Sequence, residues 1–215
     1  MSDRRHSVRR REGGRWADVL DEHRAAQVSH ILTVAFDLLR ERGVAALTMS
    51  AVAERAGISR ATLYHYFPDV DALLSAWVGR EIGESITAML AEATTIADPL
   101  ERIEHLVTAQ ALAFESQDHR LSAEHFETEA GSPAVRREVA AQLAPLRQFL
   151  TDTISEADQA GLLRTRVDPS LGADLVLGIL GALRRHIVGR RLTADEAVPI
   201  VMELLTSGWF HAQKK

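Results

Sequence analysis

Apolar residues recur at three- and four-residue steps along almost the whole of this 215-residue chain. No stretch alternates apolar and polar residues between hairpin turns, as a half-buried strand would. The clearest example is the segment 25–42, whose apolar residues return at helical spacing until Gly43 ends the pattern. The period therefore predicts an all-α protein.

Capping residues and breakers predict where the helices begin and end. Thr48 and Ser59 are good N-caps for two short helices, which Gly57 separates and Pro68 ends. Longer helices are expected over about 69–95, from 99 onward, and over about 133–160, 170–189 and 194–211. Pro145 is expected to kink or divide the helix in which it lies.

The two short helices and the longer one before them predict a helix-turn-helix, whose second helix can enter a major groove. Leu63 and Phe67 lie four residues apart and can reach the core. The outward residues are Arg60, Ala61, Thr62, Tyr64 and His65, with Tyr66 near the boundary. Tyrosine and histidine edges can donate to phosphates, and Arg60 and Thr62 can reach base edges. For the helix alone, the alternative is that the tyrosines are packing residues and His65 a solvated surface group.

Charge is unevenly distributed along the chain. Residues 1–67 carry a net charge of +3 and the remainder −8, which gives −5 overall. Six arginines precede the first periodic pattern: Arg4, Arg5, Arg9, Arg10, Arg11 and Arg15. This composition predicts a basic flexible arm over 1–20 with an anion as its neighbour, although a solvated tail has the same pattern. A helix-turn-helix domain over 21–68 and a larger helical domain over 69–215 are expected to follow.

The run GVAALTMSAVAERAGISRATLYHYF, from Gly43 to Phe67, resembles the DNA-binding signature of the TetR family of bacterial transcriptional regulators. The family pattern has a glycine, a threonine that opens a helix, an apolar-Ala pair, Ala-Gly-apolar-Ser at the turn, and a closing Leu-Tyr-x-Tyr/His-Phe. The matching positions are Gly43, Thr48, Val52, Ala53, Ala56, Gly57, Ile58, Ser59, Leu63, Tyr64, Tyr66 and Phe67.

The resemblance implies a division of the DNA contacts. Thr48, Tyr64 and Tyr66 are expected to hold phosphates, and the helix that Ser59 opens favours a phosphate at its N-terminus. Bases are expected to be read by Ser50, Arg60, Ala61, Thr62 and His65. Where many relatives have a phosphate-binding lysine, this chain has Val70 between two aspartates. We expect the arginine arm to compensate by reaching along the adjacent minor groove.

The last two predicted helices are amphipathic, and their apolar faces are larger than the core of a single chain can bury. Part of these faces is therefore assigned to a four-helix homodimer interface, formed by Leu175, Ile179, Ile200, Leu204 and Leu205. Members of the family dimerise in this way. A two-fold dimer would set its recognition helices about 34 Å apart, which matches a palindromic operator in double-stranded DNA.

The resemblance also implies a small-molecule effector pocket between the fourth and eighth helices, with ligand binding pulling on the fourth. Polar groups on apolar stripes, and rings near them, are the candidate contacts. They are Trp77, His105, Gln110, Phe114, His125, Phe126 and Arg147. The alternative is that the rings are core residues and the polar groups reach solvent. The sequence does not identify the effector.

An enzyme is not expected. The chain has no phosphate-binding Gly-rich loop and no Gly-x-Ser-x-Gly elbow. The pairs Glu101–His105 and His125–Glu129 offer two ligands each, whereas a catalytic metal usually needs three. Neither a catalytic metal nor a cofactor is therefore expected, and a structural metal in the C-terminal domain is the alternative that these pairs leave open.

Without cysteines or a long apolar run, the chain is expected to be cytoplasmic, with no membrane segment. We predict a repressor that a small molecule releases from its operator. The alternative is a TetR-like DNA-binding architectural or cell-division factor with no small-molecule effector.

Overall fold

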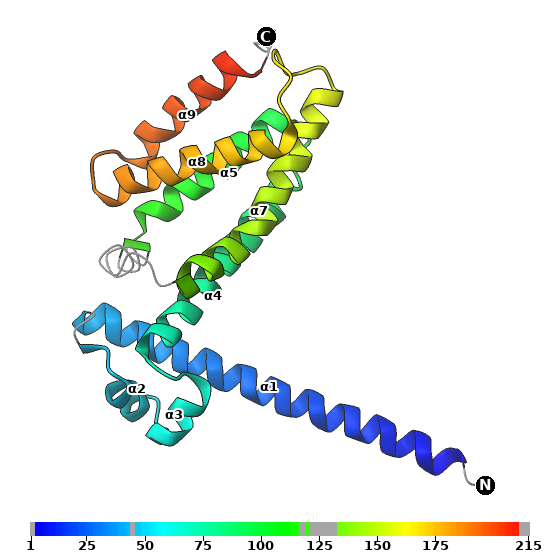
Figure 1. Ribbon diagram of the computed structural model, residues 1–215, viewed down its shortest axis with the longest axis vertical. Helices are drawn as coiled ribbons and strands as arrows, with labels where there is room; N and C mark the ends of the chain where they lie inside the picture. The colour runs from blue at the N-terminus through cyan, green and yellow to red at the C-terminus, as the bar shows by residue number, and fades with distance from the viewer. Residues whose placement is uncertain (1–2, 44–45, 117–118, 121–132, 211–215) are drawn as a thin grey trace. The chain divides into compact units, whose positions relative to one another are not determined.

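The computed structural model describes residues 3–43, 46–116, 119–120 and 133–210. The chain divides into two compact units, Met1–Trp77 and Val78–Lys215, and both are built from helices (Figure 1). The division falls inside α4 (Val70–Ala93), whereas the sequence suggested a boundary at 68/69. The reason is packing, because the first turns of α4 bury Leu73 and Leu74, and the Trp77 ring stacks on Phe36 with centroids 4.4 Å apart.

The first unit contains α1 (Asp3–Arg42), α2 (Met49–Arg55) and α3 (Arg60–Tyr66). Their inward residues Ile31, Leu39 and Leu63 are at most 1% exposed. Thr48 and Ser59 cap α2 and α3 as the sequence predicts. The Thr48 hydroxyl accepts the Ala51 amide at 3.1 Å, and the Ser59 hydroxyl accepts the Thr62 amide at 3.0 Å. The predicted helix-turn-helix is therefore present.

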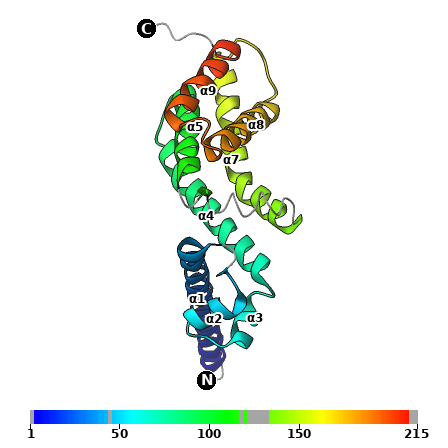
Figure 2. The same ribbon diagram turned by 90° about the vertical axis from the view of Figure 1, so that its left-hand side faces the viewer.

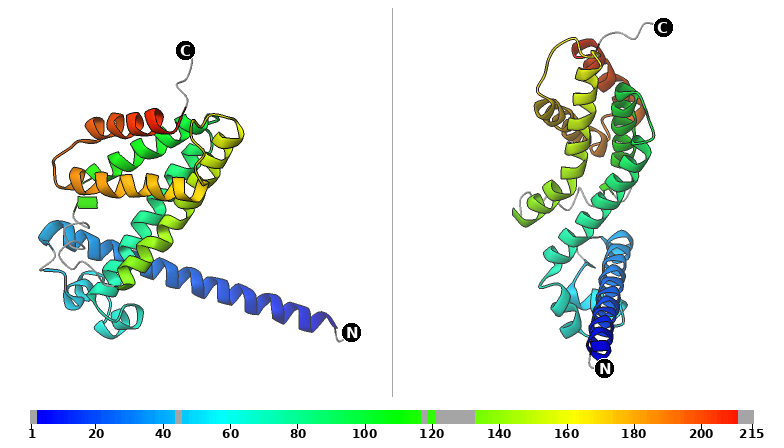
Figure 3. Two further views of the ribbon diagram at one scale, coloured as in Figure 1. Left: turned by 45° about the horizontal axis from the view of Figure 1, so that its top comes forward. Right: turned by 90° about the vertical axis from the view of Figure 1, so that its right-hand side faces the viewer.

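The amino-terminal segment differs from the expected flexible arm. α1 is one helix from Asp3 to Arg42, so residues 3–20 are helical. The physical reason is that no proline interrupts residues 1–42, and the arginines, alanines and leucines there are good helix formers. Residues 21–26 are all exposed, and full burial begins only at Ile31. Figures 1 and 3 show α1 continuing well beyond α2 and α3.

The second unit contains the rest of α4 with α5 (Pro99–Glu115), α7 (Pro133–Gln159), α8 (Pro169–Val188) and α9 (Ala194–Gly208). α5 packs against α7, α8 and α9, and Figure 2 shows α5 beside α9 and α7 beside α8. Ile103, Val107, Leu150 and Ile154 form the centre of this core with no exposed surface. α7 runs through Pro145 without the division that the proline suggested.

Side-chain caps fix the helix starts of the second unit. The Asp98 carboxylate accepts amides at the start of α5, and the Asp168 carboxylate does the same at the start of α8. At the start of α9, Thr193 and Glu196 form a reciprocal capping box. The backbone and side-chain hydrogen bonds from Thr193 hold the pKa of Glu196 below its usual value. These caps satisfy amides that a helix start would otherwise leave unpaired.

Arg102 ties the connection between α4 and α5 to α7. Its Nε donates to the Ile96 carbonyl at 3.1 Å, and its Nη1 donates to the Glu156 carboxylate at 2.8 Å. The Arg102 side chain is only 13% exposed, and its guanidinium carbon lies 5.7 Å from the centre of the Phe149 ring.

Among the described residues, no helix combines the length and the apolar character that a bilayer crossing requires.

Candidate nucleic-acid interface and ligand pocket

The start of α3 is held in place by its cap and by the turn before it. Ser59 Oγ lies 2.8 Å from Thr62 Oγ1 and accepts the Thr62 amide. Gly57 has a φ of +66°, which favours glycine, and the next amide, that of Ile58, donates to the Ala53 carbonyl at 3.0 Å. The opposite side of α3 is anchored by Leu63, which is completely buried. One side of this short helix is thus fixed, and the other is left outward.

The outward side of α3 carries most of the residues that the sequence assigns to DNA. Tyr64 is 46% exposed, and the His65 ring meets the Tyr66 ring edge-on with centroids 5.4 Å apart. Thr62 and Tyr66 are half-buried. The exposed members of the predicted set are Thr48, Ser50, Ser59, Arg60, Ala61, Tyr64 and His65. This surface offers hydroxyl, imidazole and guanidinium groups to a partner.

Two contacts that the sequence analysis missed hold the helix-turn-helix against α1. Both terminal nitrogens of Arg55 donate to the Glu41 carboxylate, at 2.5 and 2.6 Å. This pairing, chiefly through its hydrogen bonds, holds the pKa of Glu41 below its usual value. On the same helix, His30 Nε2 lies 3.4 Å from the Ala56 carbonyl oxygen. Opposite charges fourteen residues apart have no periodic signature, so the sequence alone could not have paired them.

The start of α4 explains the place where the chain departs from the family pattern. Val70 is the first residue of α4 and is half-buried, so a valine suits its surroundings. Asp69 Oδ1 accepts the Ala72 amide at 2.7 Å, as an N-cap residue does. The Asp69 carboxylate therefore has a structural role at this helix start, where negative charge is favourable.

α8 and α9 leave large apolar side chains on the surface. On α8, Leu171 is 52% and Leu175 45% exposed, and on α9, Ile200 is 49% and Leu204 58% exposed. Ile179, also predicted for a dimer interface, is half-buried. Leu205 is not on this surface, contrary to the prediction, because it is 2% exposed. Successive residues of a helix are about 100° apart, so Leu204 faces outward while Leu205 faces the core.

The residues predicted to contact a small molecule lie in unrelated surroundings. Trp77 belongs to the first unit and is 2% exposed against Phe36. His105, on α5, has its Nε2 3.4 Å from a Glu92 carboxylate oxygen of α4.

On α7, Arg147 donates to both carboxylate oxygens of Asp174, at 2.6 and 2.9 Å. Phe114 is buried and Gln110 half-buried on α5. The other two predicted contacts, His125 and Phe126, lie outside the described residues. Of the predicted ligand residues that the structure describes, none is among the residues that line a pocket between α4 and α7.

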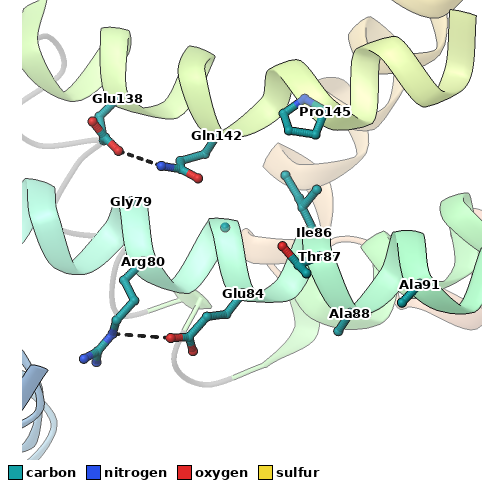
Figure 4. A pocket seen from close by; sticks show the side chains of 11 residues that line it. Gly79, Arg80, Glu84, Ile86, Thr87, Ala88, Ala91, Glu138, Gln142 and Pro145 are labelled. Atoms are coloured by element: carbon teal, nitrogen blue, oxygen red, sulfur yellow. Dashed lines mark hydrogen bonds and ion pairs between the residues drawn. The ribbon is translucent and has the colours of Figure 1, made fainter. Parts of the chain in front are cut away.

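That pocket has a volume of about 650 Å³ and lies between α4 and α7. Figure 4 shows Ile86 of α4 reaching toward Pro145 of α7. Beside them, Gln142 Nε2 donates to Glu138 Oε1 at 2.8 Å. α7 contributes Glu138, Gln142 and Pro145, and α4 contributes Gly79, Arg80, Gly83, Glu84, Ile86, Thr87, Ala88 and Ala91. The lining therefore combines small and apolar residues with a few polar groups, which is typical of ligand sites.

Two glycines of α4 shape the pocket. A Cβ at Gly79 would lie 2.5 Å from Glu138 Oε1, and one at Gly83 would lie 2.6 Å from Gln142 Oε1. The absence of side chains there lets the two polar groups of α7 lie directly against α4. Two glycines four residues apart are a usable sequence signal for such a pocket, whereas apolar stripes alone do not reveal it.

A neutral histidine lies elsewhere in the second unit. Arg184 Nε donates to His119 Nε2 at 3.0 Å, and the Phe114 ring lies 5.0 Å from the imidazole. Burial, with a smaller contribution from the Arg184 charge, lowers the pKa of His119 from 6.5 to about 4. In the described part of the chain, no three His, Asp or Glu side chains are grouped as metal ligands would be.

Comparison with known proteins identifies relatives of this architecture. Residues 31–77 match a family described as bacterial regulatory proteins, tetR family. This range contains the packed part of α1, all of α2 and α3, and the start of α4. An HTH-type transcriptional regulator of Bacillus subtilis (strain 168), YdeS, is 31% identical over 157 residues, which are 69% of this chain and 73% of the relative.

Two solved structures have the same fold over most of their length. A transcriptional regulator from Saccharomonospora viridis, in complex with choline, has a TM-score of 0.70 and 21% identity, covering 87% of this chain and all of its own. FadR from Bacillus subtilis, in complex with stearoyl-CoA, has a TM-score of 0.67 and 19% identity, covering 84% of this chain and 98% of its own. At these identities the likeness shows the fold.

Proposed function

Because the chain belongs to the tetR family of bacterial regulatory proteins, we propose that it represses transcription by binding a palindromic operator as a homodimer. A small molecule bound in the second unit releases the operator. Relatives from Bacillus subtilis and Mycobacterium tuberculosis are named as HTH-type transcriptional regulators, which is the function class adopted for this chain.

The observation that carries the proposal is the capped, outward face of α3. Its inner side is fixed by Leu63 and its start by Ser59, so the exposed groups of Arg60, Tyr64 and His65 have a defined orientation. A helix of this kind can place its first residues at base edges while its rings contact phosphates. We therefore assign base reading to Ser50, Arg60, Ala61, Thr62 and His65, and phosphate binding to Thr48, Ser59, Tyr64 and Tyr66.

The exposed apolar surface of α8 and α9 supports a homodimer. Large apolar residues grouped on a surface favour a protein partner, and a two-fold axis would let one surface serve both chains. A Cβ at Gly178 or Gly181 would meet no atom within 4 Å, so a partner helix has room to approach there. The proposed interface is Leu171, Leu175, Ile179, Ile200 and Leu204.

The pocket between α4 and α7 is the proposed effector site. Its volume of about 650 Å³ is within the range of small-molecule pockets. α4 continues from this pocket into the first unit, where it buries Leu73, Leu74 and Trp77. A ligand that displaces α4 would thus act on a helix that is part of the DNA-binding unit. Neighbours of this fold hold choline and stearoyl-CoA, which are the first compounds to test.

Selection of bound duplexes from a random pool tests the DNA-binding proposal. The expected product is a palindrome with two half-sites. His65→Ala should change the preferred bases, while Tyr64→Phe should weaken binding to all sequences about 30-fold, because the dimer loses one hydrogen bond of about 1 kcal/mol from each subunit. The matched control is His186→Ala, at an exposed histidine of the second unit. A chain that selects no sequence, or variants with unchanged preference and affinity, would contradict the proposal.

The mass of the chain in solution tests the dimer. Leu204→Glu should yield a monomer in light scattering, because it places a charge in the proposed apolar interface. Leu112→Glu is the control, since Leu112 is 52% exposed on α5 and outside that interface. A parent chain that stays monomeric at high concentration would refute the homodimer.

Operator release tests the effector site. If a compound releases the operator from the parent but not from Gln142→Ala, the compound acts through the α4–α7 pocket. Gln148→Ala is the control, because Gln148 is an exposed glutamine of the same helix. If no compound from a broad panel changes either operator affinity or melting temperature, the architectural or cell-division factor without an effector becomes the better hypothesis.

A further inference from the structure

We propose that the amino-terminal extension of α1, residues 3–15, binds the phosphate backbone of DNA that flanks the operator, without regard to its sequence. The inference rests on the proposed function, because it adds contacts outside the operator to those of α3. It assigns a partner to a charged segment that lies outside the matched family range of 31–77.

Charge is the first observation. Residues 3–15 contain six arginines against Asp3 and Glu12, whereas the chain as a whole carries −5. The guanidinium group stays protonated and donates in a fork that fits phosphate oxygens. Polyanionic DNA binds such a segment by releasing its condensed counterions, which requires no contact with bases.

Helical geometry is the second observation. Residues 3–15 of α1 are helical, so they span about 20 Å at about 1.5 Å per residue. This length corresponds to about six base pairs at roughly 3.4 Å each. A helix about 10–12 Å wide does not fit a minor groove about 6 Å wide. The minor-groove contact expected for a flexible arm is therefore replaced by contacts to the phosphates that border the grooves.

The position of the segment within its own unit is the third observation. Residues 21–26 are exposed, so the helix leaves the packed core of the first unit well before it reaches its arginines. Figure 1 shows α1 running on past α2 and α3. The part of α1 that joins the extension to the packed core is therefore open to solvent at residues 21–26.

Helix energetics give a second measurable consequence. Cations near the N-terminus of a helix oppose its dipole, and Gly13 and Gly14 lower the helix propensity of the segment. Phosphates beside the arginines would remove the first of these penalties. DNA with flanks should therefore increase the protection of the amides of residues 3–15 against hydrogen exchange.

The test compares full-length variants on two duplexes, the selected operator alone and the operator with about 12 added base pairs on each side. The arm variant carries Gln at Arg4, Arg5, Arg9, Arg10, Arg11 and Arg15, because glutamine has a similar helix propensity without the charge. The control variant changes net charge equally, by Gln at the exposed second-unit residues Arg136, Arg137, Arg164, Arg166, Arg190 and Arg191.

Affinity is measured between 50 and 200 mM salt. If three arginines of the bound dimer contact phosphates, the salt slope of the arm variant is smaller by about 2.7, which is roughly 40-fold in the affinity ratio across this range. The parent and control variant should gain affinity and amide protection from the flanks, and the arm variant should not.

Three outcomes would overturn the proposal. They are an equal gain from the flanks in the parent and the arm variant, an equal loss in the arm and control variants, and a gain that depends on the flank sequence. Because all comparisons use the operator that the parent binds, failure of the extension leaves the proposed function intact. Failure of the parent to bind any duplex would instead refute both.

Discussion

Removal of the α3 cap gives a direct test of the recognition helix. In Ser59→Ala, the Thr62 amide and hydroxyl lose the oxygen that lies 3.0 and 2.8 Å away. Loss of a serine N-cap costs about 1 kcal/mol, within a range of about 0.5–2. α3 has only seven residues, so one lost cap affects its whole length. At 25 °C, 1 kcal/mol corresponds to about a fivefold change in an equilibrium.

The expected result has two parts. Exchange of the first amides of α3, followed by mass spectrometry of a peptide that covers 58–67, should become about fivefold faster. Operator affinity should fall by up to the same factor, because the bound state requires the helix to be formed and the apparent affinity follows the fraction of free chains in which it is formed. Ser59→Asn should retain most of both properties, since asparagine is an equally good cap.

Thr193→Ala is the matched control, because it removes the corresponding cap of α9 in the second unit. It should destabilise that helix by about 1 kcal/mol and leave the intrinsic operator affinity of the folded chain unchanged. The reasoning fails if Ser59→Ala exchanges and binds like the parent. It also fails if the two cap variants lose operator affinity equally, since the effect would then be one of global stability.

Other predictions concern the second unit. Below pH 6.5 the unfolded chain binds a proton that folded His119 excludes, so stability should fall as pH drops toward the folded pKa of about 4. The free energy of unfolding should fall by about 3 kcal/mol, at about 1.4 kcal/mol per pKa unit. Urea titrations between pH 7 and 4 measure this loss, and His119→Gln should reduce the dependence of stability on pH. Arg102→Met should lower the free energy of unfolding by about 2 kcal/mol, as thermal unfolding measures it, because it removes a largely buried, hydrogen-bonded charge. Glu156→Gln changes the exposed partner of this pair and should lower it by less than about 1 kcal/mol. Gly83→Ala should displace the Gln142 side chain and weaken effector-induced operator release, with little change in melting temperature because alanine favours the helix by about 1 kcal/mol.

The helix-turn-helix could be predicted closely from the sequence, because the signals that define its helices are local. Thr48 and Ser59 cap the helices that their positions indicate, and Gly57 adopts the positive φ that the turn requires. Leu63 is buried and Tyr64 exposed, as their spacing along one turn predicts. In each case the determining partner lies within four residues along the chain.

Features that depend on distant partners could not be predicted in this way. Leu205 looked equivalent to Leu204 in sequence, and only the packing of α9 on α5 separates a core residue from an exposed one. The pocket depends on Glu138 and Gln142 meeting two glycines more than fifty residues earlier in the chain. A flexible arm was predicted over the first twenty residues because they are rich in arginine. Residues 3–20 are helical instead, because they continue the helix whose later part packs against the core.

The continuity of α4 limits how this protein can change over evolutionary time. A tether between two domains tolerates gains and losses of residues, but α4 joins the units through an unbroken helix. One inserted residue between Trp77 and Ala91 would turn the later side chains of α4 by about 100° about the helix axis and shift them by about 1.5 Å along it. If the α4–α7 pocket is the effector site as proposed, new ligand preferences should arise by replacing side chains along α4, with its length kept constant.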